Sequence, residues 1–261
     1  MIQQYFEDPN TQKLILIFAR LTGLIAFVPP FMNNKISVQI KGGFIMILTI
    51  ALSGIVKSAD VAIPMNFPEM GLAVAFELLI GFIIGFSVQI LFTSFQLAGE
   101  FVDRHIGFAM ASLVDPQTDI TVSILGSLLM NLGLFLFIDL GGHNWVLETF
   151  AGSFRTIPLL SMNVNEAGIL YHMSELFVKA LTFAAEFSIP VIIFVTLIYV
   201  IQGFMQRTIP QLQIFVVGFI FTITAGIFSI RLLMEQFIPA SEGIIEYFQQ
   251  RVWFIISHLD G

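Results

Sequence analysis

Six long apolar stretches dominate the sequence and leave few folds open to the chain. They cover about residues 14–32, 43–59, 70–98, 120–140, 172–202 and 212–235. A helix needs roughly 20 apolar residues to cross a bilayer core of about 30 Å. The second stretch is short, and the third and fifth are longer than one perpendicular span needs, so kinked or broken helices are expected. The sequence therefore predicts an all-α, polytopic membrane-type protein of about six apolar segments that form kinked or broken helical hairpins.

The charge content supports an apolar solvent. Only 11% of the residues are charged and 57% are hydrophobic, whereas a soluble domain carries roughly 25% charged residues. The formal net charge of −7 excludes the basic surface that nucleic-acid binding requires. We therefore expect membrane lipid, and no nucleic acid, around this protein.

No motif in the sequence predicts catalysis or a cofactor. The chain has no cysteine, and its histidines, His105, His143, His172 and His258, lie far apart without the spacing of metal ligands. The HExxH and GxSxG signatures and the GxxxxGK[ST] phosphate loop are missing from the sequence. No repeat or flexible linker divides the chain, so residues 1–261 are predicted to form a single non-enzymatic domain without metal or cofactor.

Four ionisable residues lie well inside apolar stretches, away from their ends: Arg20, Glu77, Lys179 and Glu186. Such residues are costly in a membrane and by default suggest function. One hypothesis is an ion-coupled secondary permease in which Glu77 and Glu186 carry coupling ions. The alternative is structural pairing at helix interfaces. Lys179 and Glu186 are seven residues apart, which places them on one helix face without direct contact.

Asp103, Arg104 and His105 are the nearest approach to a catalytic cluster. An intramembrane enzyme would use Asp103 and His105. Adjacent residues on a helix do not face one another, so a solvated charged cluster is the competing interpretation.

Small residues mark another candidate interface. Gly81 and Gly85 form a small-xxx-small pair, and Gly99 continues the same glycine-rich run. Such residues let helix backbones approach closely in lipid. The sequence leaves packing within the chain and packing between subunits equally open.

Two connections interrupt the apolar pattern. The stretch GFAMASLVDP, residues 107–116, is small and apolar yet ends in a turn signal. It could seal a pore by dewetting, with Phe108 and Met110 as a pliable constriction, or pack as a re-entrant loop in the chain's own core. The second connection contains Arg207, Pro210 and Gln211, and it predicts a helical hairpin with a charged tip.

Several of these residues, in this order, resemble the FliR family of flagellar and other type III export-gate membrane proteins. The matching blocks are Arg20, Gly23 and Pro29-Pro30; Glu77, Gly81 and Gly85; Ala98 to Pro116; Gly142-His143; Ser153-Phe154 with Ile157-Pro158; and Arg207, Pro210-Gln211, Phe215 and Gly218. The DPQ and PQLQIF blocks look more like the flagellar branch. Gln213, Ile220 and Asp119 depart from the usual family residues.

The resemblance implies a subunit that forms a closed pore for unfolded export substrates with FliP and FliQ, and that is needed for flagellar assembly. It also implies neighbours of the FlhB and FlhA families and a place in the bacterial inner membrane at the flagellar basal body. The pore plug would comprise Gly107, Phe108, Ala109, Met110, Ala111, Ser112, Leu113, Val114 and Asp115. The expected helix-packing and charged-interface residues are Arg20, Glu77, Gly81, Gly85, Glu100, Asp103, Arg104, Lys179, Glu186, Arg207, Pro210 and Gln211.

Overall fold

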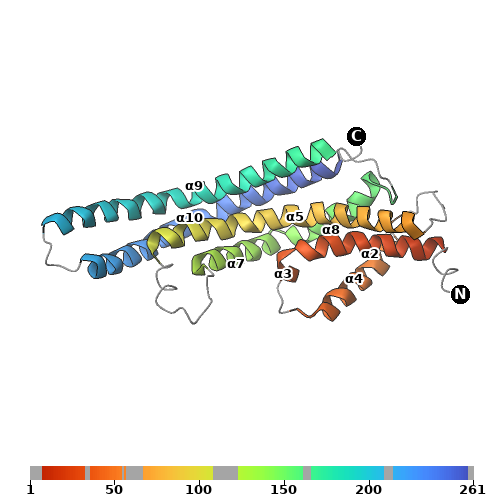
Figure 1. Cartoon of the computed structure of the whole chain (residues 1–261), viewed down its shortest axis with the longest axis horizontal. Coiled ribbons are helices and arrows are strands. Elements are labelled where there is room, and N and C mark those ends of the chain that lie inside the picture. Colours follow the sequence, from red (N-terminus) through yellow and green to blue (C-terminus); the bar gives the residue numbers. More distant parts are fainter. Residues whose placement is uncertain are drawn as a thin grey trace. The chain divides into compact units, whose positions relative to one another are not determined.

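A computed structural model describes residues 8–32, 36–54, 56, 67–107, 123–160, 166–208 and 214–257. Every regular element in these residues is a helix (Figure 1). The all-α prediction is therefore confirmed. The helices are α2 (Pro9–Phe27), α3 (Pro29–Met32), α4 (Val38–Ser53), α5 (Phe67–Ile106), α7 (Ile124–Asp139), α8 (Gly142–Thr156), α9 (Glu166–Thr208) and α10 (Ile214–Ser257).

The longest apolar helices account for the membrane character. Within the described residues, α5 and α9 are each long and apolar enough to cross a membrane. The number rises to four if α7 with α8, and the two parts of α10, each count as one bent span. Helix α4 is apolar but shorter. These lengths fit an all-α membrane protein with broken helices, as the sequence predicts.

Local sequence explains several helix ends. Asp8 precedes α2 and its side chain accepts from the Asn10 amide at 3.3 Å, with Pro9 in the first turn. Between α7 and α8, Gly141 has a φ of +73°, a left-handed conformation that only glycine adopts without strain. This glycine lets α7 end and α8 begin within two residues.

Contacts divide the chain into two compact units. The first comprises Met1–Ile90, Gly141–Leu176 and Tyr247–Gly261, and the second comprises Leu91–Leu140 and Phe177–Glu246. Helices α5, α9 and α10 contribute residues to both units. A single export-gate domain over residues 1–261 stays a prediction.

In the first unit, glycines let α2 and α5 approach closely. A Cβ at Gly81 would collide with the Arg20 carbonyl oxygen, and one at Gly85 would collide with that of Leu24. Gly23 of α2 meets α5 in the same way. The small-xxx-small residues thus pack within the chain, as expected where backbones touch in an apolar medium.

Aromatic side chains fill the core of the second unit. The Phe95 ring lies 5.4 Å from Phe183 and 5.9 Å from Phe237 between centroids, which joins α5, α9 and α10. Gly133 of α7 leaves room for the same ring, because a Cβ there would overlap it. Phe95 is fully buried, so this cluster is a packed core rather than a lumen.

Serine and threonine hydroxyls along the helices bond to carbonyls of their own helix. Thr49 donates to the Ile45 oxygen at 2.8 Å, Ser188 to Ala184 at 2.6 Å and Thr196 to Ile192 at 2.6 Å. This back-bonding satisfies a donor locally. It suits helices whose surroundings offer no water.

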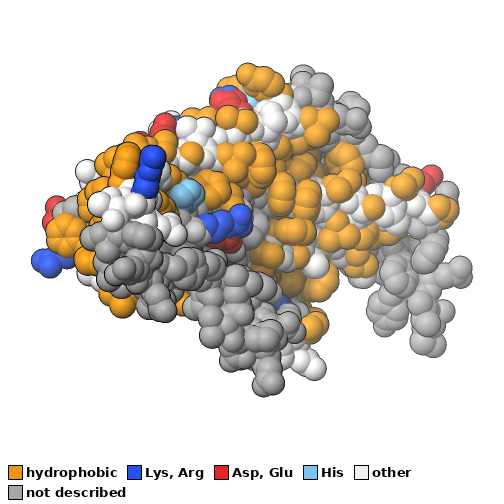
Figure 2. Space-filling model, turned by 60° about the vertical axis from the view of Figure 1, so that its left-hand side comes forward, with side chains coloured by type: hydrophobic (Ala, Val, Ile, Leu, Met, Phe, Trp, Pro, Cys, Tyr) orange, Lys and Arg blue, Asp and Glu red, His pale blue; other side chains and the backbone are white. Residues whose placement is uncertain are grey.

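Figure 2 shows many hydrophobic side chains on the face in view. On α9, four residues with helical spacing form an exposed stripe: Ile193, Leu197, Val200 and Phe204 are 56%, 56%, 50% and 70% exposed. We call these four residues the α9 stripe. An apolar face this continuous needs lipid or a partner to cover it.

Candidate functional site

A buried polar cluster lies at the centre of the first unit. Arg20 of α2 is fully buried and its Nε donates to Glu77 Oε2 of α5 at 2.5 Å. Its other guanidinium nitrogens donate to Ser153 Oγ at 3.1 Å and to the Ile157 carbonyl oxygen at 3.2 Å. The guanidinium carbon also lies 4.1 Å from the centre of the Phe154 ring.

The helix packing described above positions this ion pair. Glu77 and Gly81 are one turn apart on α5, so they share a face. Gly81 brings that face against the α2 backbone at Arg20 itself. Close approach and charge pairing therefore depend on the same turn of each helix.

The arrangement of Arg20 and Glu77 favours a structural ion pair between helices over a site that binds a transported ion. Burying a charge is tolerated only when it is paired and hydrogen-bonded, and both conditions hold here. The Glu77 carboxylate already accepts from Arg20, and its residue is 1% exposed. The cluster thus links α2 and α5 to the end of α8, where Ser153, Phe154 and Ile157 lie.

A second polar cluster joins the end of α5 to the start of α7, in the second unit. One Asp103 carboxylate oxygen accepts hydrogen bonds from Ser123 Oγ and, at 3.2 Å, from the Leu125 amide. Ser123 in turn caps α7 by accepting from the Gly126 amide at 2.8 Å. The backbone oxygen of Asp103 accepts from the Gly107 amide at 3.1 Å. Asp103 therefore fixes both ends of the connection between the two helices.

This geometry does not assemble a catalytic pair from Asp103 and His105. The His105 ring nitrogen Nδ1 lies 2.7 Å from the Phe101 carbonyl oxygen, one turn back along α5. The His105 carbonyl oxygen accepts from the Tyr199 hydroxyl at 2.8 Å, which ties α5 to α9. Each side chain has its own partner. Among the described residues, no group of acidic or histidine side chains could hold a metal ion.

The other predicted interface residues are scattered along the helices. Arg104 is exposed and lies 3.6 Å from Glu100, one turn earlier. Gly99 packs against the α7 backbone at Leu125. On α9, Lys179 is half-buried, Glu186 is exposed, and Arg207 is exposed in the last turn.

Part of the predicted site lies outside the described residues. Of the plug residues, Gly107 is described, with a φ of +92° directly after α5. Plug residues 108–115 lie outside the described residues, as do Pro210 and Gln211 at the predicted hairpin tip. The arms of that hairpin are described: Gln202 Nε2 of α9 donates to the Gly218 carbonyl oxygen of α10 at 3.0 Å.

Some residues and contacts of these sites could not be predicted from sequence motifs. Ser153 is 133 residues from Arg20, and in the sequence only the family resemblance points to its block. Ser123 gave no signal beyond a serine ahead of an apolar run, although that is a recognised helix-start pattern. The bond between Gln202 and Gly218 had no sequence signal.

Comparison with known proteins identifies the family. The family model for bacterial export proteins, family 1, matches residues 11–248. This chain belongs to that family. The match includes Arg20, Glu77 and Asp103, and so covers both polar clusters.

Relatives of this export family extend over most of the chain. The flagellar biosynthetic protein FliR of Escherichia coli (strain K12) is 29% identical over 243 residues, covering 92% of this chain and 91% of that protein. FliR of Bacillus subtilis (strain 168) is 26% identical over 207 residues, 78% of this chain and 79% of that protein. The surface presentation of antigens protein SpaR of Shigella sonnei is 27% identical over 261 residues, 98% of this chain and 96% of that protein.

Family membership and helix composition together define the class. The chain is a membrane-embedded structural component of a bacterial export apparatus, not an enzyme. The resemblance to the FliR family is confirmed. A secondary permease using Glu77 and Glu186 is not favoured, because Glu77 is paired with Arg20 and the relatives carry export names.

Proposed function

We propose that the chain is a subunit of the flagellar-type (type III) protein export gate and that it forms a closed pore for unfolded substrates with FliP and FliQ family proteins. The observation that carries this proposal is the match of residues 11–248 to an export family, with relatives named FliR. The apparatus would lie in the bacterial inner membrane at the flagellar basal body and serve flagellar assembly. FlhB and FlhA family proteins would be neighbours.

The plug role falls on the connection from Gly107 to Asp115. A plug must return to one position each time the pore closes, so both of its ends need rigid anchors. Asp103 anchors the two ends of the longer connection that contains the plug, because its backbone oxygen binds the Gly107 amide and its carboxylate binds Ser123, eight residues beyond Asp115. This doubly anchored connection supports the proposal. The small apolar residues 107–114 at the start of this connection are suited to exclude water.

The α9 stripe supports the partner assignment. Its members repeat at intervals of four and three residues, the spacing with which one helix packs along another. Hydrophobic residues of this size at an open face are suited to contact further helices of an assembly. FliP and FliQ family proteins are the occupants we propose.

Co-expression tests this function. The chain is produced with FliP and FliQ from the same cell, extracted in mild detergent and weighed by native mass spectrometry. We expect one discrete complex containing all three proteins. The double substitution Leu197→Asn and Phe204→Asn in the α9 stripe should abolish the complex. Gln206→Ala, an exposed change on the same helix outside the α9 stripe, is the control and should leave it intact.

A different result would overturn the proposal. If the unsubstituted chain runs alone as a stable, monodisperse species in the presence of both partners, it is not a subunit of such a gate. Solute uptake by liposomes containing the chain alone, lost in Glu77→Gln, would then support the permease.

A further inference from the structure

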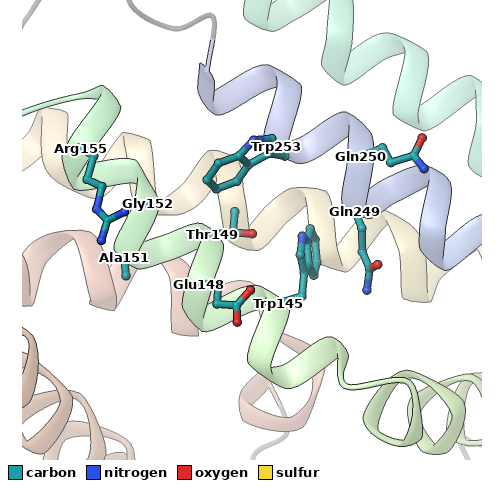
Figure 3. Close-up of a pocket in the computed structure, with 9 residues that line it drawn as sticks. All are labelled: Trp145, Glu148, Thr149, Ala151, Gly152, Arg155, Gln249, Gln250 and Trp253. Atoms are coloured by element: carbon teal, nitrogen blue, oxygen red, sulfur yellow. The ribbon is translucent and has the colours of Figure 1, made fainter.

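An open pocket of about 560 Å³ lies between α8 and the C-terminal part of α10, in the first unit (Figure 3). Its walls include Trp145, Glu148, Thr149 and Arg155 from α8 and Trp253 from α10. These two tryptophans are the only ones in the chain. Neither polar cluster described above contributes to this pocket.

The tryptophans give the pocket an interfacial character. Tryptophan is enriched where a protein passes from lipid to water, because the indole ring is apolar with one polar N–H. Trp253 is 50% exposed and lies in a C-terminal stretch that mixes charged and apolar residues. Its ring lies against the α8 backbone at Gly152, where a Cβ would come within 2.8 Å of the ring. The absent side chain at Gly152 thus shapes this wall.

Opposite charges occur at the two ends of the α8 wall. Glu148 and Arg155 are both exposed, and neither has an ion-pair partner within the described part of the chain. They are two helical turns apart, about 10 Å along the axis. That spacing is too long for direct pairing. It fits a short ligand that carries an anion at one end and a cation at the other.

The pocket wall also holds an unsatisfied polar group. Thr149 is 1% exposed, and its hydroxyl has no hydrogen-bond partner among the residues that the structure describes. Figure 3 shows this side chain between the two tryptophans. A buried hydroxyl without a partner is unfavourable, so an added polar group would compensate for it.

We propose that this pocket binds the headgroup of a zwitterionic phospholipid that carries a phosphate and a primary ammonium group. Arg155 donates charge-assisted hydrogen bonds to the phosphate. Glu148 and the Gln249 amide oxygen accept from the ammonium, which also lies against an indole face. The acyl chains leave the headgroup site toward the lipid; Leu147 and Phe254, each next in sequence to a pocket residue, are exposed apolar side chains. The proposal requires only a membrane-embedded chain and does not rest on the gate function.

The paired charges select this ligand over related lipids. An anionic lipid without an amine would leave Glu148 unpaired beside a negative phosphate. A choline headgroup has no N–H to donate to Glu148 or Gln249. We therefore expect affinity to fall from ethanolamine to choline to glycerol headgroups.

The two tryptophans make a direct measurement possible in the intact chain. Full-length protein in mild detergent is titrated with phosphatidylethanolamine whose acyl chains are brominated, since bromine quenches nearby indole emission. We expect saturable quenching, and brominated phosphatidylglycerol should need at least about tenfold more lipid. Trp145→Phe and Trp253→Phe single variants should each keep a quenched residual emission.

Charge variants separate the two ends of the headgroup. Arg155→Gln should raise the half-saturation concentration for both lipids about tenfold, the loss of roughly one charge-assisted hydrogen bond. Glu148→Gln should weaken phosphatidylethanolamine binding alone. Arg231→Gln removes an exposed arginine from the second unit and is the matched control, with no change expected. Arg155→Lys keeps the charge and should restore most of the affinity, which excludes misfolding as the cause.

Three outcomes would overturn the proposal. Equal, non-saturating quenching by all lipids would mean ordinary boundary lipid. Displacement by soluble glycerophosphoethanolamine at the same concentration as the lipid would mean a site for a free metabolite. Loss of the bound lipid when the chain assembles with its partners, followed by native mass spectrometry, would mean that a protein segment occupies the pocket.

Discussion

Arg20 of α2 and Glu77 of α5 form a fully buried ion pair, with 2.5 Å between Nε and Oε2. They are 57 residues apart in sequence. The pair lies where Gly81 brings the two helix backbones into contact. The ion pair and the close helix packing therefore stabilise one another at this point. Substitutions that disturb either should lower the free energy of unfolding.

Removing one partner of this pair should destabilise the protein strongly. Arg20→Ala leaves the Glu77 carboxylate buried without a cation, so we expect a loss of about 3–5 kcal/mol in the free energy of unfolding. The measurement is a titration with SDS in mild detergent. Arg104→Ala, which breaks the exposed pair with Glu100, should cost less than about 1 kcal/mol. A loss for Arg20→Ala no larger than this control would contradict the buried tie.

The double variant Arg20→Met with Glu77→Leu removes both charges at once. Replacing a whole buried pair by apolar residues is often neutral, because no uncompensated charge remains. We expect it to recover much of the stability lost in Arg20→Ala. Additive losses in the same SDS titration would show that the two residues do not interact.

Glycine substitutions should have opposite signs at two positions. Gly81→Ala forces a Cβ into the Arg20 carbonyl oxygen, so we expect destabilisation of about 1–3 kcal/mol or more. At Gly203 of α9 a Cβ meets open space, and alanine there should stabilise by up to about 1 kcal/mol. Thermal unfolding in mild detergent compares them. Equal shifts at both positions would refute the close approach of α2 and α5.

The anchors of the proposed plug give a functional prediction. Asp103→Ala removes the acceptor for Ser123 and for the Leu125 amide, so the connection should lose one fixed end. We expect increased ion leakage through the assembled complex, measured as membrane conductance. Glu100→Gln, one turn away on α5, is the control and should leave conductance unchanged. If the membrane conductance of the Asp103→Ala complex stays as low as that of the unsubstituted complex, the Asp103 carboxylate has no role in sealing the pore.

Deleting residues 107–114 tests the plug itself. The deletion removes most of the small apolar connection, so we expect a complex that still assembles and conducts ions continuously. Native mass spectrometry verifies assembly in the same preparation. Unchanged conductance in an assembled complex would count against a plug at these residues.

The sequence predicted elements better than contacts. The apolar stretches at 70–98 and 172–202 lie within α5 and α9, because hydrophobic length is a local property. It also singled out Arg20 and Glu77, since charges in apolar stretches are conspicuous. It could not pair them, because the partners come from different helices and are brought together only by tertiary packing.

The sequence left two interpretations of Asp103 and His105 open, a catalytic pair and a solvated charged cluster. Neither describes Asp103, which is 4% exposed and accepts hydrogen bonds from Ser123 and the Leu125 amide, while the His105 ring nitrogen lies 2.7 Å from the Phe101 carbonyl oxygen. Successive helix residues point in different directions. Only the position of the next helix decides which of them meets a partner.

The hydroxyls that bond back to their own helices bear on how an assembly recognises this chain. Thr182, Thr196 and Thr224 each direct a donor to a carbonyl one turn earlier, so these hydroxyls are not offered outward. A helix packed over one of these threonines therefore finds no hydroxyl hydrogen directed toward it. At such positions, recognition depends on how large and small side chains fit against those of the neighbouring helix. A fit of this kind tolerates a shift by one helical turn more readily than a change in side-chain size.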